Sequence, residues 1–124
     1  MAEVIGGIIV GKRTVMYSFA AGDETITYLH AAAIYTGDLD GPADETFVAV
    51  DHVDGTQTHY GWGSFTGLVH GKAGTLLWKF KGKPGSGDIE IYDGSGDAGG
   101  LRGDVAYWMN GNDKDSFTYR GNLG

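Results

Sequence analysis

The stretch from residue 47 to residue 66, FVAVDHVDGTQTHYGWGSFT, reads as two short strands joined by a hairpin turn. Residues 47–53 are rich in β-branched side chains, and residues 59–66 alternate aromatic side chains with glycine. Asp54-Gly55 between them is a strong hairpin signal, because both residue types tolerate the positive φ angles of a tight turn. This stretch therefore predicts an antiparallel pair of strands.

The same pattern recurs along the chain. Glycine makes up 23 of the 124 residues and separates segments of strand character, which are residues 14–19, 25–35, 75–80, 88–92, 104–109 and 116–120. The three consecutive alanines in residues 25–35 also suit a short helix, but the alternation there favours a strand. About eight strands with short links predict an all-β fold. We expect one antiparallel barrel over residues 1–124, with residues 1–12 as an edge strand or arm.

Composition excludes several classes of protein. The formal net charge of −7 and the scatter of nine Lys and Arg among sixteen Asp and Glu argue against a nucleic-acid partner. Without cysteine the chain has no disulfide and no sulfur metal site, which fits a cytoplasmic location. No apolar run approaches the roughly 20 residues that span a bilayer, and the apolar start lacks the basic leading segment of a signal peptide.

Three pieces of the sequence together resemble the DUF3224 family of small bacterial proteins. They are Tyr35-Thr36-Gly37-Asp38-Leu39-Asp40-Gly41, then Gly63-Ser64-Phe65-Thr66-Gly67 with Gly71-Lys72-Ala73-Gly74-Thr75, and Gly94-Ser95-Gly96 leading to Leu101-Arg102-Gly103. The resemblance covers residues 31–123. It implies an eight-stranded barrel like that of plant allene oxide cyclase, with a cup-like apolar interior.

Relatives of that shape include cyclases and isomerases that fold a flexible hydrophobic substrate inside the barrel. The resemblance thus implies binding of a hydrophobic small molecule, with cofactor-independent isomerisation or cyclisation by substrate preorganisation as the extension. The alternative is a non-catalytic, lipocalin-like carrier or a protein-interaction barrel. This chain has Gly63 and Phe80 where the family pattern often carries a Glu and a Gln-His pair, which weakens any transfer of chemistry.

Aromatic side chains are the main candidates for a ligand pocket. Tryptophan and tyrosine from several strands can wall a cavity where facing glycines leave room, although a filled aromatic core is the alternative. The candidate ligand-binding residues are Tyr17, Tyr28, Trp62, Trp78, Phe80, Tyr107 and Trp108. His30 and Tyr60 are the candidate catalytic residues, because each is a polar group that alternation places beside aromatic side chains.

Other polar residues carry weaker expectations. His52 lies opposite His59 if the hairpin loop has four residues, but two histidines are one ligand short of a zinc site, so we expect no metal. Arg102 is expected to brace the glycine-rich connection by donating to backbone carbonyls, or to receive a substrate carboxylate. We find no cofactor motif. Self-association is expected if the apolar segment of residues 4–10 does not pair with the barrel.

Overall fold

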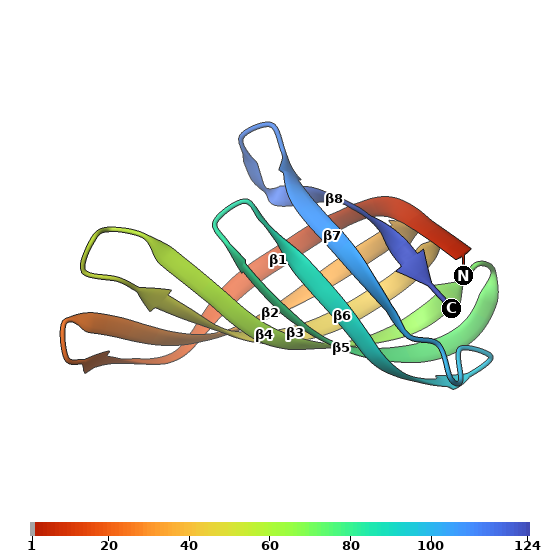
Figure 1. The fold of residues 1–124 in the computed structure, drawn as a ribbon, viewed down its shortest axis with the longest axis horizontal. Helices are drawn as coiled ribbons and strands as arrows, with labels where there is room; N and C mark the ends of the chain where they lie inside the picture. The colour runs from red at the N-terminus through yellow and green to blue at the C-terminus, as the bar shows by residue number, and fades with distance from the viewer. Residues whose placement is uncertain (1) are drawn as a thin grey trace.

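Residues 2–124, which the computed structural model describes, form one closed sheet of eight antiparallel strands. The strands are β1 (Ala2–Ala21), β2 (Glu24–Gly37), β3 (Leu39–Asp51), β4 (Gln57–Val69), β5 (Lys72–Lys83), β6 (Ser86–Gly96), β7 (Gly103–Asn110) and β8 (Asp113–Leu123). Each strand pairs with the next, and β8 pairs with β1 (Figure 1). The predicted all-β fold and its eight-stranded antiparallel barrel are confirmed. No helix in residues 2–124 is long and apolar enough to cross a membrane.

The amino-terminal segment closes the barrel. Ala2 pairs with Leu123, and the ladder between β1 and β8 runs as far as Ile9 opposite Ser116. Beyond Ile9, β1 continues for twelve more residues along β2 alone, with bulges between Val10 and Arg13 and between Val15 and Tyr17. The hairpins β1–β2 and β3–β4 consequently project past the other strands on one side of the barrel (Figure 1).

One end of the barrel is filled by side chains. Leu39, Val69, Ala98 and Leu123 are buried there together with the ring of Tyr119. The Tyr119 hydroxyl accepts a hydrogen bond from the Leu39 amide at 2.8 Å and donates one to the Thr36 carbonyl at 2.8 Å. Tyr119 therefore ties β8 to the connection between β2 and β3, and the start of β1 and the end of β8 lie at this same end (Figure 1).

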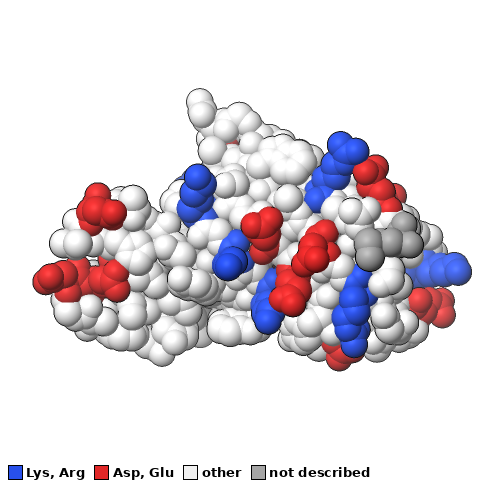
Figure 2. Space-filling model, in the orientation of Figure 1, with Lys and Arg blue, Asp and Glu red and all other residues white. Residues whose placement is uncertain are grey.

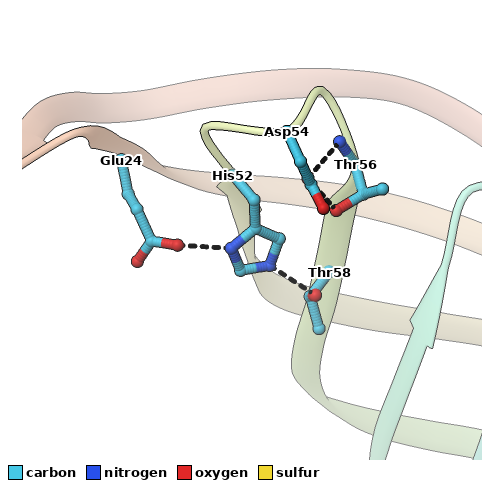
Figure 3. Close-up of polar contacts among 5 residues, drawn as sticks. All are labelled: Glu24, His52, Asp54, Thr56 and Thr58. Carbon is cyan, nitrogen blue, oxygen red and sulfur yellow. Dashed lines mark hydrogen bonds and ion pairs between the residues drawn. The ribbon is translucent and has the colours of Figure 1, made fainter.

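The tips of the two projecting hairpins are joined by a small polar cluster. His52 contacts the Glu24 carboxylate through Nδ1 and Thr58 Oγ1 through Nε2, the latter at 2.7 Å (Figure 3). In the turn beside it, the Thr56 hydroxyl donates to Asp54 at 2.6 Å, which lowers the pKa of that carboxyl. The predicted turn at Asp54-Gly55 is present, with Gly55 at a φ of 88°.

Candidate functional site

A cavity of about 360 Å³ occupies the other half of the barrel, next to the projecting hairpins. Its wall is mostly apolar, and the polar residues in it come from seven of the eight strands. The lining residues are Ile8, Val10, Arg13, Ala31, Ala33, Tyr35, Glu45, Phe47, His59, Phe80, Lys83, Pro84, Gly85, Ile89, Tyr107, Met109, Lys114 and Phe117. At close-packed density this volume suits a ligand of roughly 10–15 non-hydrogen atoms.

The cavity exists because the inward face of β2 carries small side chains. Ala31 and Ala33 point into the barrel and are each 2% exposed, whereas their neighbour Ala32 points outward. Below them the interior is closed by Tyr35 and Trp78, whose ring centroids lie 5.2 Å apart. Two alanines on one strand thus leave the space that larger side chains fill at the closed end.

Glu45 is the carboxyl group of the cavity wall. It faces inward from β3, opposite Ala31 on β2 and Gly63 on β4. The Tyr35 hydroxyl donates a hydrogen bond to Glu45 Oε1 at 3.1 Å. The part of Glu45 left uncovered borders the cavity, and protein surrounds it otherwise, so burial raises its pKa to about 7 although the Tyr35 hydrogen bond lowers it. Near neutral pH this carboxyl can therefore both give and take a proton.

Trp78 adds an unused hydrogen-bond donor beneath the cavity. It is fully buried, and its indole nitrogen Nε1 has no hydrogen-bond partner among residues 2–124. The indole lies over Gly63, where an added Cβ would come within 2.0 Å of Nε1. Gly63 stands between Glu45 and Trp78 in one cross-strand row, so the free N–H and the carboxyl belong to the same part of the interior.

The two phenols near Glu45 remain protonated. Burial, followed by the charge of Glu45, raises the pKa of Tyr35 well above its ordinary value. Burial also raises the pKa of Tyr107, again with a contribution from Glu45. Both side chains therefore act as neutral hydrogen-bond donors at physiological pH.

Positive charge gathers at the mouth of the cavity. Arg13 reaches from β1 across to the start of β8, where it contacts Asp115 Oδ1 at 2.6 Å and donates to the Lys114 carbonyl at 2.7 Å. Lys83 and Lys114 also line this rim.

His59 is a neutral member of the cavity wall. Burial lowers the pKa of His59, and the nearby charge of Arg13 lowers it further while Asp51 opposes the shift, so this imidazole is neutral at physiological pH.

The aromatic residues predicted from the sequence divide into two groups. Phe80 and Tyr107 line the cavity, and Trp78 lies fully buried beneath it. The others face the outside of the barrel, so the predicted inward placement is wrong for Tyr17, Tyr28, His30, Tyr60, Trp62 and Trp108. On β4 the inward positions belong to Gly61 and Gly63, which places Tyr60 and Trp62 outside with exposures of 47% and 55%.

The polar candidates His30, His52 and Arg102 lie outside the cavity. His30 points outward, 3.6 Å from Asp44 Oδ1. The loop after β3 has five residues, so His52 does not lie opposite His59; Ala49 holds that position, and the conditional pairing fails. Arg102 donates to the Leu101 carbonyl at 3.0 Å, which agrees with the expected contact to a backbone carbonyl of the glycine-rich connection. It lies beside Gly124 at the closed end of the barrel, away from the cavity mouth.

Sequence reasoning missed Glu45, Tyr35 and Arg13 as site residues. The signal for Glu45 was the alternation of Ala43, Glu45 and Phe47, which puts a carboxyl in phase with two apolar residues. It was overlooked because the predicted strand began at residue 47, whereas β3 begins at Leu39.

Comparison with known proteins agrees with this architecture. A solved structure of a protein of unknown function from the DUF3224 family of Shewanella oneidensis MR-1 aligns with a TM-score of 0.84, covering 100% of this chain and 97% of that one. The chain has a DUF3224-type fold. The two sequences are 16% identical, so the likeness concerns the fold alone. The chain matches no family model and no curated protein.

Proposed function

We propose that this barrel binds a small hydrophobic molecule in its interior. The observation that carries the proposal is the apolar cavity of about 360 Å³ with one carboxyl in its wall. Apolar pockets with a few convergent polar groups are the usual form of a small-molecule site, and the polar groups orient the ligand. The Lys and Arg side chains at the rim favour a ligand whose outer end is polar or anionic.

The test compares a variant whose new side chain fills the cavity with a control variant on the outward face of the same strand. We expect 2-naphthol, which has the size of the cavity, to bind with a dissociation constant on the order of 0.1 mM by isothermal titration calorimetry. Ala33→Leu fills the space and should weaken binding by roughly tenfold or more. Ala32→Leu, whose side chain faces outward, should bind as the parent does.

The two alanine variants also define failure of the proposal. Equal weakening by Ala33→Leu and Ala32→Leu would place the bound probe outside the barrel. Absence of measurable heat at millimolar 2-naphthol would contradict the proposal directly. Circular dichroism spectra that match the parent confirm that both variants are folded.

A second proposal concerns self-association through the outside of the projecting hairpins. An outer patch is formed there by apolar and aromatic side chains of β1 to β4, namely Tyr17, Phe19, Ile26, Tyr28, Val48, Val50, Tyr60 and Trp62. Tyr17 and Tyr28 stack with their centroids 4.7 Å apart, and Tyr17 remains 55% exposed. Exposed apolar surface of this extent is typical of protein interfaces.

We propose a second copy of this chain as the occupant of the outer patch. Half-exposed aromatic residues offer about 100 Å² each, so the four most exposed supply on the order of half of the 800 Å² per partner in a standard interface. Acidic side chains gather at the far ends of the hairpins (Figure 2). An antiparallel arrangement of two copies keeps those acidic ends apart, which favours face-to-face packing of the sheets.

A further inference from the structure

We propose that Glu45 is a catalytic residue that moves a proton on a bound ketone. The inference rests on the proposed binding function, because the ketone must enter the barrel cavity. The substrate class is a small apolar ketone with an acidic C–H next to its carbonyl group, and the reaction is migration of a carbon–carbon double bond.

The Glu45 carboxyl is held in place by a single hydrogen bond. Tyr35 holds Oε1 at 3.1 Å, and this is the one hydrogen bond that residues 2–124 supply to the carboxyl. Oε2 accepts no hydrogen bond from these residues, and Glu45 lines the cavity, so this oxygen is available to a ligand. A carboxyl held by one donor in an apolar wall keeps a fixed direction and is not neutralised by a cation in contact with it.

The ketone oxygen needs a hydrogen-bond donor that faces the cavity. Abstraction of a proton next to a carbonyl group moves negative charge onto that oxygen, and a fixed neutral donor stabilises the charge. Tyr107 lines the cavity together with Glu45, and because burial raises the pKa of its phenol, the hydroxyl stays protonated and is such a donor.

The reaction balances without any further reactant. In a β,γ-unsaturated ketone the Glu45 carboxylate takes a proton from the α carbon, and the electrons of that C–H bond move into a dienolate. The carboxylic acid then returns the proton to the γ carbon while the double bond shifts to the α,β position. The product is an isomer of the substrate, Glu45 regains its initial state, and nothing is oxidised or reduced.

Several other titratable or charged groups face the same cavity, and the test must separate them from Glu45. They are Arg13 on β1, Tyr35 on β2, His59 on β4, Lys83 on β5, Tyr107 on β7 and Lys114 on β8. Among these, His59 is the group whose ordinary pKa lies closest to the raised pKa of Glu45, and its own pKa is lowered by burial.

The experiment measures the proton-transfer step on a defined probe. The full chain is incubated with 2-tetralone in deuterated buffer, and loss of the proton signal at C1 is followed by NMR. We expect the protein to accelerate exchange, and Glu45→Gln to reduce the protein-dependent rate by about 100-fold. Asp44→Asn changes the neighbouring, outward-facing carboxyl and should leave the rate unchanged.

The pH profile separates a buried carboxyl from an ordinary one. The active form is the carboxylate, so the rate should rise with pH and be half-maximal near pH 7, where an exposed Glu would already be ionised. Tyr35 is a positioning residue, and Tyr35→Phe removes a hydrogen bond that lowers the pKa of Glu45, so the midpoint should move to higher pH. His59→Gln should leave the midpoint in place.

Three outcomes overturn the inference. Exchange that survives Glu45→Gln, or that falls equally in Asp44→Asn, assigns the proton transfer to another group. Binding of 2-tetralone without accelerated exchange removes the catalytic role of Glu45 while the binding function stands. Failure of both 2-tetralone and 2-naphthol to bind removes the binding function and the catalysis together.

Discussion

At the scale of single residues, Glu45 combines a site for proton transfer with a cost in stability. The pKa of Glu45 has its ordinary value of 4.5 in the unfolded chain and rises to about 7 in the barrel, so the carboxyl binds its proton more tightly when the protein is folded. Between about pH 4.5 and pH 7 the folded state therefore holds more protons, and stability falls as pH rises through that window. A carboxylate at this position disfavours folding above neutral pH.

Glu45→Gln should accordingly stabilise the barrel at alkaline pH. The shift of the Glu45 pKa from 4.5 to about 7 corresponds to about 3 kcal/mol at most, so we expect a gain of about 1–3 kcal/mol at pH 8. At pH 4 the carboxyl of the parent is protonated and the two proteins should differ little. Urea unfolding at both pH values measures this, and a variant less stable than the parent at pH 8 would contradict the assigned burial of Glu45.

At the scale of elements, the inward row of Glu45, Gly63 and Trp78 across β3, β4 and β5 decides the shape of the interior. Glycine at the middle position lets the Trp78 indole lie flat across β4, because no Cβ occupies the space. Glu45 lies directly opposite Gly63 on the neighbouring strand and lines the cavity. Gly63 thus links the packing of the core to the polar end of the cavity.

Gly63→Ala should be destabilising even though alanine suits a strand better than glycine. Its Cβ would lie 2.0 Å from Trp78 Nε1, so the indole must move within a packed core, which costs about 2 kcal/mol. Ser64→Ala, on the outward face of the same strand, is the matched control and should change little. The midpoint of urea unfolding measures both, and a Gly63→Ala midpoint at or above that of the parent would show that the row is loosely packed.

At the scale of the whole molecule, closure of the barrel and projection of two hairpins are consequences of unequal strand lengths. The twenty residues of β1 pair with β8 only as far as Ile9 and continue along β2, while β7 has eight residues. Arg13 and Asp115 bridge the point where β1 and β8 part. The projecting part presents the outer patch on a surface that the barrel itself does not cover.

Self-association through that patch is tested by placing positive charges in it. We expect the parent to sediment as a dimer at about 100 μM. The double change Tyr17→Lys and Tyr60→Lys should yield a monomer, because it buries charge in the apolar contact. Ser64→Lys, exposed on the same outer face nearer the closed end, should leave the dimer intact. A monomeric parent, or a dimer that survives the double change, would contradict the proposed interface.

The sequence by itself determined the strand count and the hairpin at Asp54-Gly55, because glycine, β-branched runs and turn residues act locally. Only the tertiary structure decided which face of each strand lies inside. Both faces of β2 are apolar, with Tyr28 and Ile34 on one and Ala31 and Tyr35 on the other, so periodicity could not choose between them. Closure of the barrel made the choice, since the face carrying Ala31 and Ala33 leaves space for the cavity beside Glu45.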